Sequence, residues 1–397
     1  MTEKTNIQQG YKDSPLGIIP KEWEVKRLGA FAPLQRGFDL PTDKIVRGEY
    51  PVVYSNGVLN YHYEYKAKGP GVVTGRSGTI GKVTFVESNY WPHNTSLWVT
   101  DFKGNNPKYV FHLYSFLDLS KFASGSGVPT LNRNDVHASK FAIPPTHEQN
   151  KIVEVLDFWD TAIEKQSELI EKLKLRKRAL MQQLLTGKKR LKVFGGEWKE
   201  VRLGDAGTAY GGLVNKNKED FENGNALFIT YMNVFSNGKI DIDNLGQVRI
   251  LSSEKQEQVQ YGDVFFTVSS ETPDEVGMTS VLLNEVQNTY LNSFCFGYRL
   301  NDFKSIVPVY ASYLFRGDDF RKEMYKIAQG STRFNISKTE VLNMRITIPS
   351  IEEQNAIASV LVNADKEIEI QKQKLAAMQA QKKGLMQVLL TGKRRIL

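Results

Sequence analysis

The chain has 397 residues, 41 % of them hydrophobic, so it is long enough for two or three domains with buried cores. Its single cysteine, Cys295, excludes a disulfide framework and a thiolate metal cage. A polar start and the lack of an 18-residue apolar run predict a cytoplasmic protein without a membrane span, while the net charge of +8 favours nucleic acid as a partner.

The first elements along the chain predict a globular part of mixed content at 1–145. Runs rich in β-branched and aromatic residues, bounded by Gly and Asn turns, predict strands at 71–74, 82–86 and 96–100. A helix is predicted at 108–119. This part is therefore expected to be α+β.

A long helix is predicted next, at 146–187, because no proline or glycine occurs between Pro145 and Gly187. A linker at 188–196 leads to a second globular part at 197–350. Here strands are predicted at 263–268 and 294–300 and a helix at 309–327. A second long helix at 351–392 and a basic tail at 393–397 complete the chain.

The two halves are copies of one pattern. An early Trp-containing motif recurs at an offset of 175, and the motifs at both ends of the long helices recur at an offset of 205. The pairs are KEWEVKRLG (21–29) with GEWKEVRLG (196–204), IPPTHEQN (143–150) with IPSIEEQN (348–355), and LMQQLLTG (180–187) with LMQVLLTG (385–392). Two copies are too few for a solenoid.

Both long helices carry apolar residues in one heptad register, which predicts an antiparallel coiled coil between them, a spacer about 55 Å long. The predicted seam comprises Ile152, Leu156, Trp159, Ile163, Gln166, Ile170, Leu173, Lys177, Leu180 and Leu184, with Ile357, Leu361, Ala364, Ile368, Gln371, Leu375, Met378, Lys382, Leu385 and Leu389. The four polar members, Gln166, Gln371, Lys177 and Lys382, either are tolerated or set register and partner choice at a cost in stability.

Polar loops in both globular parts offer side chains that suit DNA. Arginine grips guanine or phosphate, amides bond adenine, and hydroxyls contact either. The candidate DNA-binding residues are Tyr54, Asn56, Arg76, Ser77, Thr79, Lys82, Asn132 and Arg133 in the first part, and Tyr231, Asn233, Ser269, Ser270, Arg333, Asn335 and Lys338 in the second. Any one of these residues, taken alone, is more typical of an ordinary polar turn, whereas their repeated placement in both halves favours a shared surface.

Signatures of catalysis are lacking in the sequence. The segment 74–83 superficially resembles a phosphate loop, but its first glycine is misplaced and Val83 supplies no hydroxyl for magnesium. The five histidines lack metal-ligand spacing, and no motif for adenosylmethionine is visible. The chain is therefore expected to be non-catalytic and to hold neither a metal nor a cofactor.

From about Gly17 to the C-terminus, the combined motifs resemble the specificity subunit of Type I restriction-modification systems. The resemblance rests on Pro20-x-x-Trp23-x-x-x-x-Leu28-Gly29, the Gly-Ser loops at 125 and 330, the Ile-Pro-x-x-x-Glu-Gln hinges and the Leu-Leu-Thr-Gly-Lys helix ends. It implies two globular α/β target-recognition domains, each reading half of a split, asymmetric DNA site. It also implies that the helices set the gap and dock two modification subunits, which carry S-adenosylmethionine and methylate adenine, and that restriction subunits join the complex.

The first recognition domain matches the family's strand and loop at 71–73 and 76–81. The second departs from it, because Val268-Ser-Ser-Glu replaces Arg-Ser-Gly-Thr after the strand. Either the second loop reads a different half-site, or it reads DNA less well. Residues 193–355 also contain 22 acidic and 16 basic side chains, so positive charge there must be confined to a patch.

Two other functions remain open from the residues. The chain could be a stand-alone DNA-binding regulator with two readers on a coiled-coil strut, or a single-chain DNA-modifying enzyme with unrecognised motifs. Methyl transfer by the purified chain would identify the enzyme. Specific DNA binding without any modification subunit would identify the regulator.

Overall fold

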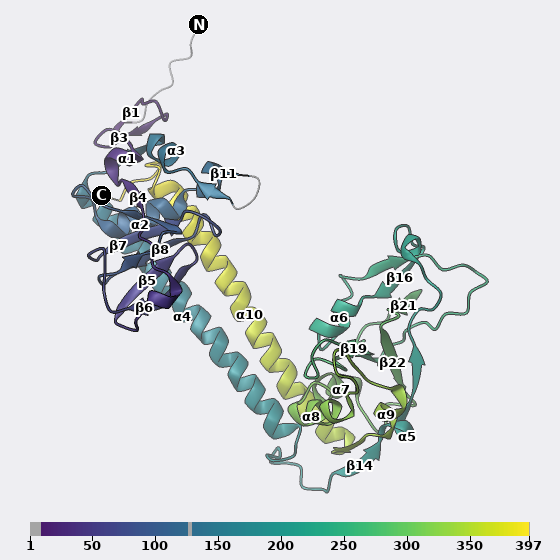
Figure 1. Ribbon diagram of the computed structural model, residues 1–397. Coiled ribbons are helices and arrows are strands. Elements are labelled where there is room, and N and C mark those ends of the chain that lie inside the picture. The colour runs from purple at the N-terminus through teal and green to yellow at the C-terminus, as the bar shows by residue number, and fades with distance from the viewer. Residues whose placement is uncertain (1–8, 126–128, 397) are drawn as a thin grey trace. The chain divides into compact units, whose positions relative to one another are not determined.

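The computed structural model describes residues 9–125 and 129–396 (Figure 1). The chain divides into two units: Met1–Glu168 with Lys372–Leu397 form the first, and Leu169–Gln371 form the second. Each unit combines sheets and short helices with segments of both long helices. None of the helices in the described residues is long and apolar enough to span a membrane.

The first unit is built on a four-stranded antiparallel sheet in the order β4 (Leu34–Arg36), β10 (Ser96–Val99), β7 (Gly71–Gly75), β8 (Val83–Val86). A three-stranded sheet has the order β6 (Gly57–His62), β5 (Tyr50–Tyr54), β9 (Trp91–Pro92). The shorter strands are β1 (Tyr11–Lys12), β2 (Ile19–Pro20), β3 (Glu24–Arg27), β11 (Ala123–Ser124), β12 (Thr130–Leu131) and β13 (Lys140–Ile143). The short helices are α1 (Leu28–Phe31), η1 (Thr42–Lys44), α2 (Pro107–Phe116), η2 (Leu119–Phe122) and α3 (Arg133–Ala138).

The second unit repeats this plan with a sheet in the order β15 (Gly207–Gly211), β22 (Cys295–Leu300), β18 (Val264–Thr267), β20 (Thr279–Val281). Its three-stranded sheet has the order β17 (Gly246–Val248), β16 (Ala226–Ile229), β21 (Thr289–Leu291). The shorter strands are β14 (Lys199–Arg202), β19 (Ser269–Ser270), β23 (Phe334–Asn335) and β24 (Arg345–Ile348). The short helices are α5 (Leu203–Ala206), η3 (Lys218–Phe221), α6 (Tyr231–Ser236), α7 (Pro308–Leu314), α8 (Asp318–Ile327) and α9 (Lys338–Asn343).

The mixed α/β content expected from the sequence is confirmed, and all five predicted strands are present as β7, β8, β10, β18 and β22. The helix expected at 309–327 is wrong as a single element. It is two helices, α7 and α8, because the chain turns at Phe315–Gly317, where the amide of Gly317 donates to the carbonyl of Leu314 at 3.0 Å.

The long helices α4 (Thr146–Leu184) and α10 (Ile351–Leu389) contain 39 residues each. The ends of both helices contribute to the hydrophobic cores of the units. Leu389 and Leu390 pack with Trp23 and Tyr109 in the first unit. Leu184 belongs to the core of the second unit, which also contains Phe266 and Phe315. These contacts bury apolar surface from segments far apart in sequence, which is the main source of their stability.

The two helices run antiparallel within each unit. In the first unit, Asp160 pairs with Lys382, and Glu148 pairs with Arg395. In the second, Lys177 pairs with Asp365 at 2.5 Å, and the chain after α4 brings Arg190 to Glu353 at 2.6 Å. In both units, the residue number of the partner decreases as the residue number on the α4 side increases, as it must for antiparallel helices.

Candidate nucleic-acid interface

The loop that follows β7 is held tightly to its neighbours. The amides of Arg76 and Ser77 donate to the carbonyl of Thr95 at 2.8 and 3.2 Å, and the amide of Leu131 donates to the carbonyl of Arg76 at 2.7 Å. A Cβ on Gly75 would lie 1.7 Å from the carbonyl oxygen of Thr79. Only glycine therefore allows the loop to fold back over the end of the strand.

A substitution of Gly75 by alanine is expected to destabilise the first unit by about 1 to 3 kcal/mol, because backbone must move to admit the methyl group. Gly384→Ala is the control, since a Cβ there meets nothing within 4 Å and alanine favours the helix by about 1 kcal/mol. Chemical unfolding of both variants measures the difference. A Gly75→Ala variant as stable as the parent would contradict the close approach.

Several of the predicted side chains share this loop surface. Lys82 Nζ donates to the carbonyl of Asn56 at 2.5 Å, which joins the loop to the turn between β5 and β6. The ring of Tyr54 lies 4.2 Å from the ring of His93, centroid to centroid. Thr79 is exposed on the same loop. The structure thus places Tyr54, Asn56, Ser77, Thr79 and Lys82 around one loop.

Beside the loop lies a hollow of about 410 Å³, into which three arginines converge from different elements. Arg36 ends β4, Arg76 follows β7, and Arg133 begins α3. Asn132 also lines the hollow, but its side chain accepts from the amide of Asn134 at 3.0 Å and so caps α3. Ser126 of the Gly-Ser loop lies outside the described residues.

The second unit holds its own loop in the same register. Strand β19 pairs Ser269 with Asn335, and the amide of Ile336 donates to the carbonyl of Val268 at 3.0 Å. The equivalent bond in the first unit joins Leu131 to Arg76. The changed loop sequence therefore keeps the backbone arrangement and alters the side chains that it presents.

Asn233 was predicted to contact DNA, and the structure corrects this. Its side chain is 3 % exposed. Its Nδ2 donates to the carbonyls of Asp241 and Asn244, and its Oδ1 accepts from the amide of Asp241 at 3.0 Å. With donors and acceptor satisfied inside the protein, Asn233 holds the loop after α6 in place and offers nothing to a ligand.

The other predictions in the second unit divide by exposure. Ser269 and Ser270 are each 8 % exposed in β19, which pairs with β23, so their hydroxyls are poorly placed for DNA. The hydroxyl of Tyr231 donates to the carbonyl of Ser269 at 2.9 Å. Three remaining candidates are exposed: Arg333, Asn335 and Lys338.

Arg36 was missed by sequence reasoning, although it is the third arginine of the hollow. Its place there depends on β4 pairing with β10, where Arg36 lies opposite Leu97. Nothing in the local sequence around Arg36 marks this long-range pairing. The repeat is the sequence signal that could have pointed to Arg36. The offset of 175 between the copies makes Gly211 the counterpart of Arg36.

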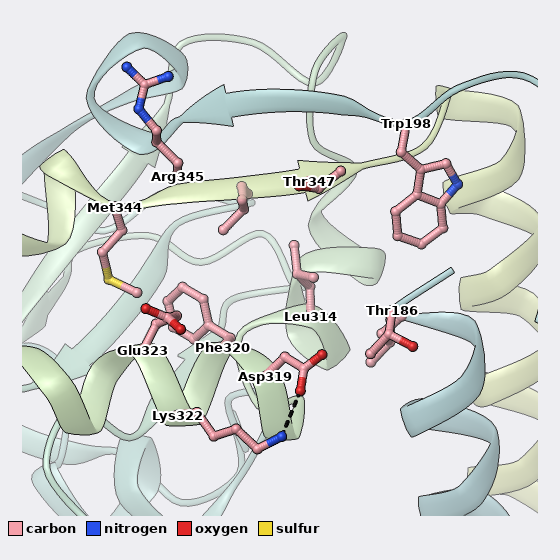
Figure 2. A pocket seen from close by; sticks show the side chains of 12 residues that line it. Thr186, Trp198, Leu314, Asp319, Phe320, Lys322, Glu323, Met344, Arg345 and Thr347 are labelled. Carbon is pink, nitrogen blue, oxygen red and sulfur yellow. Dashed lines mark hydrogen bonds and ion pairs between the residues drawn. The ribbon is translucent and has the colours of Figure 1, made fainter. Parts of the chain in front are cut away.

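A second hollow, of about 470 Å³, lies in the second unit (Figure 2). Trp198, Leu314, Phe320 and Met344 contribute apolar surface to it, and Asp319 pairs with Lys322 at 2.9 Å along its edge. Its charged side chains are of both signs. It therefore lacks the concentration of positive charge that marks the hollow with three arginines.

Within residues 9–125 and 129–396, one group of side chains has the spacing of a metal site: His112, Asp157 and Asp160, with ligand atoms within 4.8 Å of one another. Lys108 lies 2.7 Å from Asp157, and Lys382 pairs with Asp160, so both carboxylates already have a cation. Burial lowers the pKa of His112, whose Nε2 bonds Asp157 at 2.9 Å. These contacts suit an ion-pair network between α2 and the long helices better than a metal centre.

Comparison with known proteins identifies the fold and the family. The model of the Type I restriction modification DNA specificity domain matches residues 20–175 and again 195–380. The chain is 24 % identical to the Type I restriction enzyme MjaVIII specificity subunit of Methanocaldococcus jannaschii, over 98 % of both chains. It is 26 % identical to the EcoprrI specificity subunit of Escherichia coli, over 38 % of this chain and 40 % of that one.

Solved structures share the fold of the chain. The S subunit from M. genitalium has a TM-score of 0.55 and 14 % identity over 98 % of both chains. A chain from a structural study of complex assembly in a type I R-M system has a TM-score of 0.61 and 16 % identity, covering 95 % of this chain and 99 % of that one. With two copies of the family's domain spanning most of its length, the chain belongs to the specificity subunits of Type I restriction-modification systems.

Proposed function

We propose that this specificity subunit reads the two halves of a split, asymmetric DNA site, one half with each of its two α+β parts. The observation that carries the proposal is the repeated loop: the segment after β7 and the segment after β18 are held in the same register, the first by Leu131 and the second by Asn335 and Ile336. In both units, exposed basic or polar side chains adjoin this loop. Phosphate contacts position such a protein, and contacts to base edges specify the sequence.

The proposed division is a target-recognition domain at 1–145, a spacer helix at 146–187, a linker at 188–196, a second recognition domain at 197–350, a second spacer helix at 351–392 and a basic tail at 393–397. The helices α4 and α10 lie within the two spacer segments. The cytoplasmic location stays a prediction.

The spacer is proposed to be an antiparallel coiled coil along the seam predicted from the heptads. All members of that seam are buried or half-buried, and Gln166 is only 6 % exposed. The seam lysines have defined partners: Lys177 pairs with Asp365, and Lys382 pairs with Asp160. Ion pairs at matching places in both copies favour one register over its neighbours.

Replacing Gln166 and Gln371 together by leucine is expected to raise the melting temperature and to loosen the helix register. Leucine adds apolar contacts at the seam, whereas the amides contribute specificity at a cost in stability. Thermal unfolding checks the first effect, and cysteine cross-linking across the helices checks the second. A lower melting temperature would contradict the proposed role of the glutamines.

The long helices are also proposed to dock two modification subunits, with restriction subunits joining the complex. Large apolar side chains are exposed on them: Phe158 is 71 %, Leu175 64 % and Ile370 59 % exposed. Exposed apolar residues of this size suit a protein partner, although scattered ones also occur on monomers. We infer that the chain is non-catalytic and that S-adenosylmethionine binds to the modification subunits.

Genome-wide detection of methylated adenines in strains with and without this gene tests the proposal. We expect methylation at one bipartite, asymmetric motif, lost when the gene is deleted, and we expect the chain to co-purify with a modification subunit. Methyl transfer by the purified chain alone would favour an enzyme. Tight, specific DNA binding without a modification subunit would favour a regulator.

A further inference from the structure

We propose that the two recognition domains share the DNA backbone unequally, with a three-arginine phosphate site in the first that the second lacks. The inference rests on the proposed function, because it assumes that both domains face DNA. Three arginines of the first domain are proposed to hold phosphate, so more phosphate contacts are expected at one half-site than at the other.

The two sites can be compared residue by residue through the strand registers. Arg36 lies opposite Leu97 in the first sheet, and Gly211 lies opposite Phe296 in the second, at the offset of 175. Arg76 and Val268 supply the equivalent carbonyls to the hairpins. Arg133 and Lys338, 205 residues apart, begin the matching helices α3 and α9. Three arginines in the first unit thus correspond to a glycine, a valine and a lysine in the second.

The arginines in the first unit carry charge that the protein itself barely neutralises. Arg36 lies 3.6 Å from Asp39, and both side chains are more than half exposed, so solvent screens the pair. Within residues 9–125 and 129–396, no ion pair engages Arg76 or Arg133. A concave surface lined by one sign of charge concentrates the field there, and guanidinium groups bind phosphate oxygens in pairs.

The second unit has a different surface at the same place. Gly211 has no side chain, and the Nζ of Lys338 lies 3.4 Å from where its Cβ would be, so the lysine covers the position that Arg36 occupies in the first unit. Val268 is half-buried and packs against the core. At the three matched positions the second unit therefore keeps one exposed cation, Lys338, where the first unit has three. Its other exposed cation beside the loop, Arg333, precedes β23, and residues 193–355 contain more acidic than basic side chains.

Salt dependence of DNA binding measures this asymmetry, because each neutralised phosphate contributes about 0.9 to the slope of log affinity against log salt. We expect the triple variant Arg36→Gln, Arg76→Gln, Arg133→Gln to lower that slope by about 2 to 3, and Lys338→Gln to lower it by about 1. At about 50 mM salt the triple variant should bind at least about 30-fold more weakly. The methylated sequence should stay the same, since phosphate contacts carry no sequence information.

The measurement uses the complex with its modification subunits and a duplex carrying the motif that is methylated in the cell, from about 50 to about 200 mM salt. Lys103→Gln is the control, because it removes an exposed cation of the first unit that does not line the hollow. The reverse transplant, Gly211→Arg, should raise the slope by about 1 and keeps the test decisive if the triple variant folds poorly, because a Cβ on Gly211 would meet only the flexible end of Lys338.

An unchanged slope in the triple variant and in the transplant would overturn the phosphate site, even with specific binding intact. A changed methylation motif in the triple variant would also overturn it, because the arginines would then contact bases. Absence of specific binding by the parent complex would instead refute the proposed function.

Discussion

Replacing Glu148 by alanine is expected to lower the free energy of unfolding of the first unit by about 3 to 5 kcal/mol. Glu148 is 1 % exposed, and its carboxylate accepts from Trp23 Nε1 at 2.9 Å and from Arg395 Nη2 at 2.9 Å. Its loss leaves a fully buried indole N–H and a nearly buried guanidinium without this partner. Such orphaned groups bear the full cost of desolvation.

The chain supplies two matched controls. Glu22→Ala removes the exposed partner of Arg395, 60 % exposed, and should cost less than about 1 kcal/mol. Glu353→Ala removes the equivalent carboxylate of the second unit, which binds Arg190 through both oxygens but has no bond to Trp198. It should cost about 1 kcal/mol less than Glu148→Ala, which is the worth of one hydrogen bond.

Denaturant unfolding, with hydrogen exchange to assign each loss to its unit, measures the three variants. The decisive comparison is Glu148→Ala against Glu22→Ala. If both lower stability by the same small amount, the buried cluster of Trp23, Glu148 and Arg395 does not hold the first unit together.

Deleting one heptad from both long helices is expected to shorten the gap between the two half-sites. Residues 161–167 and 375–381 are the matched segments, because their removal keeps the pairs Asp160–Lys382 and Lys177–Asp365 in register. The spacer loses about 10 Å, or about three base pairs. Since DNA turns once in about 10.5 base pairs, the domains must also accommodate a rotation, so we expect a gap shorter by about one to three base pairs and slower methylation.

Sequencing of methylated adenines reads the new gap directly. Deletion of 161–167 alone is the control. It shifts α4 out of register with α10, so that the pairs Asp160–Lys382 and Lys177–Asp365 cannot both form, and it should abolish methylation. A double deletion that methylates the parental motif with its parental gap would refute the idea that the helices act as a ruler.

The sheets and helices were predictable because their signals are local. The buried run Gly-Val-Val-Thr-Gly of β7 and the proline and glycine that bracket α4 are each readable within a few residues. Long-range pairings were not predictable in the same way. Glu148 belongs to the repeated Glu-Gln motif, which is visible in the sequence. Its partners, Trp23 and Arg395, are 125 and 247 positions away, so the structural role of the motif could not be predicted.

Site residues were harder still, because residue type does not show the direction of a side chain. Asn233 and Asn335 look alike in sequence, but the first is enclosed by the loop at 241–244 and the second is exposed. The repeat itself proved the better guide. Aligning the two copies by strand register reveals that Arg36 and Gly211 are counterparts, which composition alone could not do.

The division of the chain into units has a consequence for biosynthesis. The second unit is a single continuous stretch, Leu169–Gln371, whereas the core of the first needs Leu389, Leu390 and the ion pair of Arg395. A chain emerging from the ribosome therefore completes the second unit before the first, although the first is made earlier. Until Leu389 and Leu390 are released, the apolar cluster around Trp23 is only partly covered, and partly exposed cores of this kind promote aggregation.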